Sequence, residues 1–154
     1  GLELEFTAQI TRGLSGFLNY GYIDAEFTDF TVADDDGNPV DNSGLDLRNA
    51  PENTIGVGLY YFLPVGFGEF SAHYNYWWRD EYHTVLNNNP IGLVDSGGFH
   101  NASLDLTFGE HYRLSVYGRN LGDERYARVV PIGISTFGNY NPPEHYGVEF
   151  TVDF

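Results

Sequence analysis

The chain has 154 residues, of which 22 are acidic and 7 are basic, and its formal net charge is −15. This excess of acid argues against a nucleic-acid partner, because phosphate groups are neutralised by clustered Lys or Arg, and the 17% of aromatic residues argues against disorder. Cysteine is absent, which excludes a disulfide framework, a thiolate metal site and a cysteine nucleophile.

The first third of the chain follows a two-residue period that predicts β-strands. Apolar residues occupy the even positions from 2 to 10, so a first strand is expected over residues 2–10. After a turn at 12–16, a second strand is expected at about 17–28. Residues 29–53 are polar and are predicted to form a long loop.

The same period continues through the middle of the chain. A third strand is predicted at about 54–63, and a short turn separates it from a fourth strand over about 70–79. Residues 85–98 are predicted to be loop, and a fifth strand is expected near 99–108.

The last third repeats this arrangement. A tight turn at 109–111 leads to a sixth strand that ends near Arg119, a third long loop covers about 121–143, and a seventh strand runs from Tyr146 to Phe154. Short and long connections therefore alternate, which is typical of antiparallel up-and-down transmembrane β-barrels with tight periplasmic turns and long external loops. Strands of about ten residues cross a bilayer when they are tilted. The predicted fold is all-β, a transmembrane barrel segment of about seven strands.

The polar faces of these strands favour a water-filled lumen. They carry charged residues such as Glu5, Asp105 and Glu149, whereas aromatic residues cluster near the strand ends, as in membrane barrels. The alternative is a soluble β-protein whose apolar face points inward. Because bacterial barrels have even strand numbers from about 8 upwards, seven strands indicate part of a larger barrel, and a chain that starts at Gly1 without methionine favours the same interpretation.

Three segments carry a family resemblance. Residues 112–126 are similar to a penultimate strand that runs into an Asn-Leu-x-Asp-x-x-Tyr segment, and residues 142–154 are similar to a last strand that ends on an aromatic residue, here Phe154. Residues 47–54 are similar to an Asn-Ala-Pro-x-x-Thr segment at the start of an earlier strand. In this order the three segments resemble the C-terminal end of TonB-dependent outer-membrane receptors. At residues 144–145 the chain departs from the family, with Glu-His where many relatives carry Arg followed by Ser or Thr.

This resemblance implies a barrel of about 22 strands with a plug domain inside it. Residues 1–154 would supply the last strands of the barrel, without the plug, and Phe154 would be the natural C-terminus that the assembly machinery reads. The implied function is TonB-dependent import of a scarce solute, such as a ferric siderophore, across the bacterial outer membrane. The implied partners are membrane lipid, the missing strands and plug of the same receptor, the solute, and TonB through the plug. No cofactor is implied.

Two groups of residues are candidates for ligand binding. Trp77, Arg79 and His83 lie near the external end of the fourth strand, where Arg and aromatic side chains would suit a planar anionic iron chelate. The alternative is an interface girdle in which Arg79 extends towards water or pairs with a neighbouring carboxylate. The second group is a basic patch on the last external loop, Arg125, Tyr126 and Arg128, and its alternative is ordinary pairing with Asp123 and Glu124.

A third candidate is a weak Ca²⁺ site. Asp34, Asp36 and Asn38 match the first three ligand positions of an EF-hand loop, but Pro39 stands where the glycine is required and Leu45 where the bidentate Glu is required. A solvated acidic loop is therefore favoured over a cation site.

No enzyme is predicted. The five histidines lack zinc spacing, and no G-x-S-x-G turn is present. Two alternative functions stay open, a small self-contained or oligomeric outer-membrane barrel and, with less support, an outer-membrane hydrolase.

Overall fold

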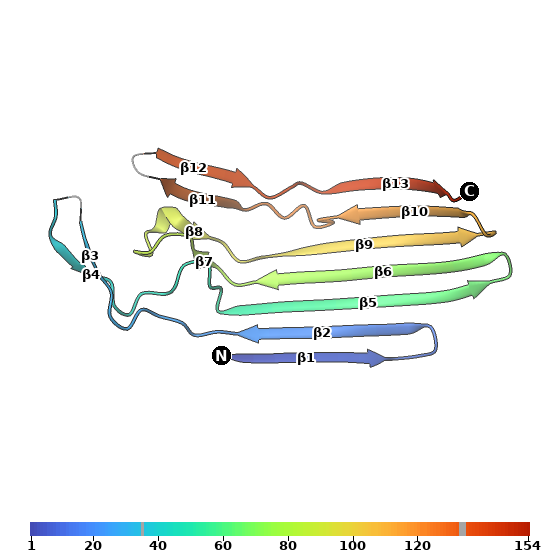
Figure 1. The fold of residues 1–154 in the computed structure, drawn as a ribbon, viewed down its shortest axis with the longest axis horizontal. Coiled ribbons are helices and arrows are strands. Elements are labelled where there is room, and N and C mark those ends of the chain that lie inside the picture. The colour runs from blue at the N-terminus through green and yellow to red at the C-terminus, as the bar shows by residue number, and fades with distance from the viewer. Residues whose placement is uncertain (35, 133–134) are drawn as a thin grey trace.

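The computed structural model describes residues 1–34, 36–132 and 135–154. Side chains are not described from residue 128 to residue 136, both included. Seven antiparallel strands form one sheet in the order β1-β2-β5-β6-β9-β10-β13, so neighbours in the sheet follow one another along the chain (Figure 1). Their bounds are β1 Leu2–Gln9, β2 Leu14–Tyr22, β5 Asn53–Val65, β6 Gly68–Arg79, β9 Gly97–Phe108, β10 Tyr112–Arg119 and β13 His145–Val152. The predicted all-β, antiparallel, seven-stranded arrangement is confirmed.

The second strand lies earlier in the chain than the prediction of 17–28. Ile10 and Thr11 both donate their amides to the Leu14 carbonyl, at 2.8 and 3.0 Å, so the turn closes at once and β2 begins at Leu14. At its other end Tyr22 pairs with Asn53, the first residue of β5. Beyond Tyr22 the regular ladder gives way to single contacts with the segment before β5, among them an isolated antiparallel bridge between Glu26 and Asp46, and the strand ends there.

The three long connections contain short elements that the sequence pattern did not predict. The first holds a hairpin of β3 Thr31–Ala33 and β4 Pro39–Asp41. The second holds β7 Tyr82–His83, a 3-10 turn η1 at Pro90–Gly92, and β8 Leu93–Val94. The third holds β11 Ala127–Ile132 and β12 Ser135–Tyr140. The prediction of plain loops was therefore wrong at these positions. The elements of the first two connections have only two or three residues, too few to show a two-residue period, whereas β11 and β12 have six residues each and lack a clear alternation of apolar and polar residues.

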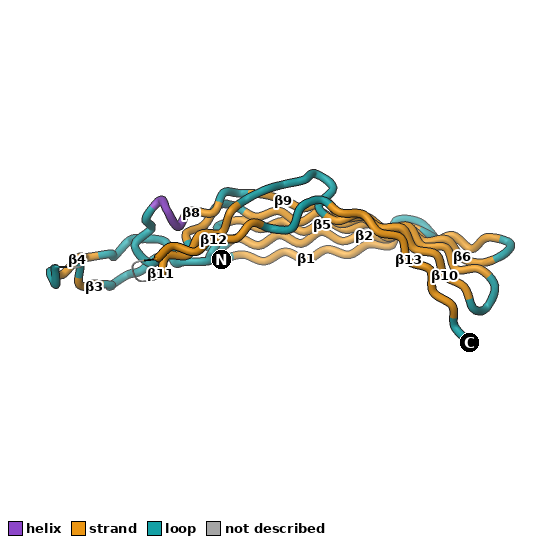
Figure 2. Tube along the Cα trace, turned by 90° about the horizontal axis from the view of Figure 1, so that it is seen from above, coloured by secondary structure: helices purple, strands orange, loops and turns teal. Residues whose placement is uncertain are grey.

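The two ends of the sheet differ. In Figure 1 the tight turns lie together at the right, and the long connections with their small hairpins lie together at the left. β1 and β13 form the two edges of the sheet, and within the chain each pairs with one neighbour. Figure 2 shows the sheet as a single curved layer. Among the described residues, no helix is long and apolar enough to span a membrane.

The apolar face of the sheet is open. Phe6, Leu104 and Val148 are 64%, 51% and 71% exposed, and the one fully buried large side chain of the described residues, Val94, belongs to the second connection. The chain exposes 10634 Å², whereas a compact monomer of 17.3 kDa exposes about 7,800 Å². An exposed apolar face of this kind marks a surface that contacts a membrane or another protein.

The opposite face is polar and hydrogen-bonded across the strands. Asn101 donates to Asn75 at 2.8 Å, and the Ser115 hydroxyl donates to the Asp105 carboxylate at 2.5 Å. The sheet therefore has one polar and one apolar surface, as the alternation predicted. The reason is the strand register, which pairs polar residues with polar residues on neighbouring strands, as at Ser71, Asp105 and Ser115.

Candidate ligand-binding surface at the loop end of the sheet

The candidate contact residues gather at the end of the sheet that carries the long connections. Arg79 ends β6, His83 ends β7, and Arg125 and Tyr126 precede β11. Trp77 lies two residues before Arg79 on the same face of β6, the polar face of the sheet, and its side chain is 55% exposed. The long connections therefore bring the two groups, which are more than 40 residues apart in the sequence, to one end of the molecule.

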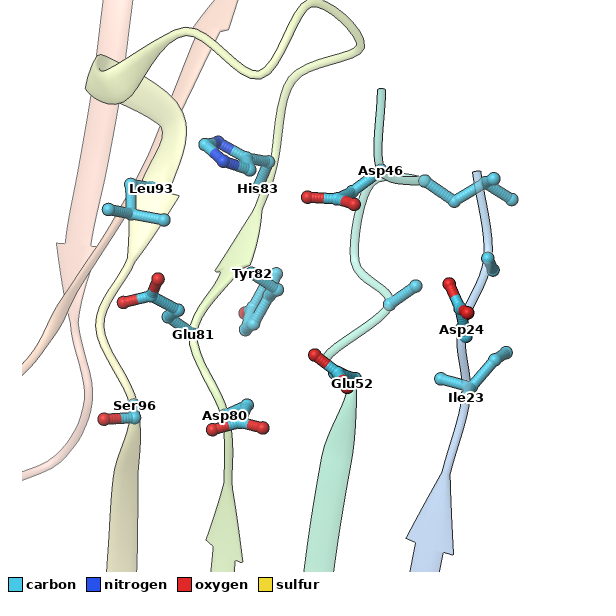
Figure 3. A pocket seen from close by; sticks show the side chains of 13 residues that line it. Ile23, Asp24, Asp46, Glu52, Asp80, Glu81, Tyr82, His83, Leu93 and Ser96 are labelled. Carbon is cyan, nitrogen blue, oxygen red and sulfur yellow. The ribbon is translucent and has the colours of Figure 1, made fainter. Parts of the chain in front are cut away.

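An acidic cavity of about 300 Å³ opens between the first and second connections (Figure 3). Its carboxylates come from three neighbouring segments, and they are Asp24, Asp46, Glu52, Asp80 and Glu81. Ile23, Leu47 and Leu93 supply apolar lining, and Tyr82 and His83 complete the wall. Five carboxylates around one opening produce a negative potential that attracts cations.

The base of this cavity is held by hydrogen bonds between strand ends. Tyr20 donates its hydroxyl to the Asn53 side chain at 2.7 Å, and Asn53 donates its amide to the Asp80 carboxylate at 2.6 Å. Within the described ranges, no group of three or more His, Cys, Asp or Glu residues is arranged to hold a metal ion. The sequence analysis singled out His83 in this cavity but not the carboxylates that surround it. The acidic residues close behind the ends of β2 and β6 could have indicated them.

Arg79 is enclosed by aromatic rings. Its guanidinium carbon lies 4.5 Å from the ring centroid of Tyr82 and 4.6 Å from that of Tyr126. One terminal nitrogen, Nη1, donates to the carbonyls of Asp80 and Asp95, both at 3.1 Å. The other, Nη2, is buried and has no hydrogen-bond partner among the described residues. The two sequence-predicted groups thus meet through Arg79 and Tyr126.

Trp77 and His83 lie apart from this stack. Trp77 lines a separate hollow of about 660 Å³ on the polar face, together with Tyr60, His73 and Asn75. His83 faces the acidic cavity, and its Nδ1 is buried without a hydrogen-bond partner among the described residues. Trp77, Arg79 and His83 therefore lie at the same end of the sheet but in three different surroundings.

Asn120 organises the base of the third connection. It is 4% exposed and adopts a left-handed backbone, with φ of 50°, a conformation that Asn tolerates better than most residues. Its side chain donates to the carbonyls of Glu124 and Pro142 and accepts from the Glu124 amide, each at 3.0 Å. Asn141 strengthens this base, because it donates to the Glu124 carbonyl at 2.6 Å and accepts from the Tyr126 amide at 2.8 Å.

Asp123 and Arg125 form a salt bridge of 2.9 Å in which both side chains are 48% exposed. This is the pairing that the sequence offered as the alternative to ligand contact. The Asp123 carboxylate also accepts the Glu144 amide at 3.1 Å. That amide, and then the Arg125 guanidinium, hold the pKa of Asp123 below its ordinary value. The predicted contact residue Arg128 has its side chain outside the part of the chain that the structure describes.

The Asn-Leu-x-Asp-x-x-Tyr segment therefore has a structural explanation. Asn120 ties the two ends of the third connection together, Leu121 donates its amide to the His100 carbonyl of β9 at 2.8 Å, and Asp123 holds Glu144. Tyr126 stacks on Arg79. Each motif residue fixes the connection to the sheet or to itself.

The calcium candidate lies in the turn between β3 and β4. One oxygen of the Asp34 carboxylate accepts the amides of Asp36 and Asn38, at 3.0 and 2.7 Å, and the other accepts the Asn38 side chain at 3.2 Å. These contacts, led by the Asn38 amide, lower the pKa of Asp34. The carboxylate thus closes its own turn, and Pro39 starts β4.

Comparison with known proteins identifies the architecture. The family model described as TonB dependent receptor-like, beta-barrel, matches residues 1–121. No protein of curated function matches the chain in sequence. Among solved structures, the fold is similar to that of the ferric yersiniabactin uptake receptor FyuA from Yersinia pestis, with a TM-score of 0.78 and 19% sequence identity. The likeness covers 99% of this chain and 23% of that receptor chain, so the chain spans less than a quarter of the receptor's length.

Proposed function

Because the chain belongs to the TonB-dependent receptor-like β-barrel family, we propose that it forms part of the wall of a receptor that imports a scarce solute in a TonB-dependent way. The family is one of outer-membrane transport receptors rather than enzymes. A ferric siderophore is the solute we favour, since the similar solved structure is a ferric yersiniabactin uptake receptor.

The observation that carries this proposal is the two-faced, single-layer sheet. Its apolar face, exemplified by Phe6 at 64% exposure and Val148 at 71%, suits the hydrocarbon of the bacterial outer membrane. Its polar face suits a lumen that holds water and the plug. Within the described part of the chain, the edges β1 and β13 each have an unpaired side, and we propose that further strands of the same receptor pair with them. TonB would act through the plug, and the exposed Phe154 would serve in assembly.

The proposed role of the long connections is capture of the solute. The candidate contact residues are Trp77, Arg79, His83, Arg125, Tyr126 and Arg128. Arg125 is half-exposed and lies on the last connection, where it pairs with Asp123, so an anionic chelate would compete with that carboxylate for the guanidinium. Arg79 stacks with Tyr82 and Tyr126, so Arg125 is the more accessible of these two arginines.

Uptake of radioactive iron tests the proposal. Cells that express the natural polypeptide containing this chain should accumulate iron from a ferric siderophore, and accumulation should stop when TonB is deleted. The variant with Arg125→Ala and Arg128→Ala should bind the chelate more weakly, whereas Arg12→Ala, in the tight turn at the other end of the sheet, should bind normally. Uptake that persists without TonB would refute the transport mechanism.

A mass measurement separates the proposal from the oligomeric alternative. In detergent, the receptor should be a single polypeptide about four times the length of this chain, as the 23% coverage indicates. A discrete assembly of several 154-residue chains would instead support a self-contained outer-membrane barrel.

A further inference from the structure

Three segments of the chain converge on Arg79. The residue ends β6, Tyr82 follows in β7, and Tyr126 comes from the segment 121–127 that leads into β11. The guanidinium lies within 4.6 Å of both ring centroids, so the two tyrosines enclose it. Its Nη1 also donates to the Asp95 carbonyl near the end of the second connection. One side chain therefore joins both halves of the second connection to the third.

The surroundings of Tyr126 are shaped for this contact. An added Cβ at Gly97 would lie 3.1 Å from the Tyr126 ring, so a glycine there lets the ring approach the start of β9. The centroid of the Phe99 ring lies 5.4 Å from that of Tyr126. Beyond the stack, β11 lies beside β8 and η1, so the contact between the two connections extends past Tyr126.

We propose that Arg79 is a positioning residue, whose stack with Tyr82 and Tyr126 latches the segment 121–127 onto the second connection, residues 80–97, so that the two move together. The latch is reversible, because cation–π contacts are of modest strength and the buried Nη2 has no acceptor among the residues that the structure describes. It concerns the coupling of the two connections and holds whichever solute the receptor takes.

Breaking the latch should loosen both connections. Both variants below remove the ring contact between Arg79 and Tyr126, and that one contact corresponds to about a two- to thirty-fold change in the opening equilibrium. Hydrogen–deuterium exchange measures that equilibrium on the natural polypeptide purified in detergent. Tyr126→Leu and Arg79→Gln should each raise exchange in 121–127 by this factor, and Tyr126→Leu should also raise exchange in 80–97. Tyr126→Phe is the matched control, since it keeps the ring and loses only the hydroxyl, and it should exchange like the wild type.

A double variant tests the coupling itself. If the two residues act on 121–127 mainly through their shared contact, Arg79→Gln combined with Tyr126→Leu should accelerate exchange there by clearly less than the product of the two single effects. Multiplied effects would overturn the proposal, and so would a Tyr126→Leu variant whose residues 80–97 keep wild-type exchange. Equal acceleration at the tight turn of residues 10–13, at the far end of the sheet, would mean general loosening and would also overturn it.

Discussion

Replacing Asn120 should open the base of the third connection. In Asn120→Ala, three side-chain hydrogen bonds disappear, two to the carbonyls of Glu124 and Pro142 and one from the Glu124 amide. Each contributes about 1 kcal/mol, and alanine adds about 1 kcal/mol of strain at the left-handed φ of 50°. Asn141 still binds the Glu124 carbonyl and offsets part of the loss. The local opening free energy should therefore fall by about 3 kcal/mol, which is roughly 100-fold in the opening constant.

Limited proteolysis with trypsin measures this opening. All seven basic residues of the chain are arginines, so trypsin, which cleaves after Lys and Arg, has few sites here. Cleavage after Arg125, inside the connection, should accelerate about 100-fold relative to cleavage after Arg12, at the other end of the sheet, as long as opening and closing are faster than cleavage. Asn139→Ala is the matched control, because this exposed asparagine of β12 makes no side-chain hydrogen bond to a described residue.

The reasoning fails if Asn120→Ala changes the rate after Arg125 by less than about three-fold, since the hydrogen bonds would then contribute almost nothing. It also fails if Asn139→Ala produces the same acceleration, because any substitution in the connection would then suffice.

Three further predictions concern pH, cation binding and packing. Contacts that lower the pKa of Asp123 stabilise the connection above the ordinary carboxyl pKa and are lost as pH falls through the lowered value; exchange protection of residues 121–127 should therefore hold down to about pH 4 and decrease below it, and Asp123→Asn should remove this dependence. Calorimetric titration with millimolar Ca²⁺ should show no heat at Asp34, whose carboxylate already accepts three hydrogen bonds; binding that Asp34→Asn abolishes would contradict this. An added Cβ at Gly68 would lie 1.9 Å from the Thr107 carbonyl oxygen, whereas one at Gly66 meets nothing within 4 Å; Gly68→Ala should lower the thermal unfolding temperature with a cost of about 1–3 kcal/mol, and equal temperatures for Gly68→Ala and Gly66→Ala would refute the clash.

The strands and their faces could be predicted from the sequence because a two-residue period is a local property. Leu2, Leu4 and Phe6 alternate with polar residues whatever lies beside them, and the short turns between strands are equally local. Strand ends are less local. The second strand stops at Tyr22 because β5 begins opposite it, and Asn53 is 31 positions away along the chain.

The role of the two faces of the sheet could be inferred only from the sequence and the tertiary structure together. The sequence predicted an apolar and a polar surface, and the resemblance predicted a receptor wall. The single layer shows that the described part of the chain covers neither face of the sheet, and Val148 is 71% exposed. An apolar face becomes a core only when another layer packs on it, and that is a property of the tertiary structure.

The sequence by itself therefore determined the seven strands, their two faces and the alternation of short and long connections. The tertiary structure decided which distant residues meet. Tyr126 stacks on Arg79 across 47 positions, and carboxylates from three segments surround one cavity. The reason is physical: alternation acts within one strand, whereas the contacts at the loop end depend on strand register and on how the connections fold back, and both arise from pairings between segments far apart in the chain.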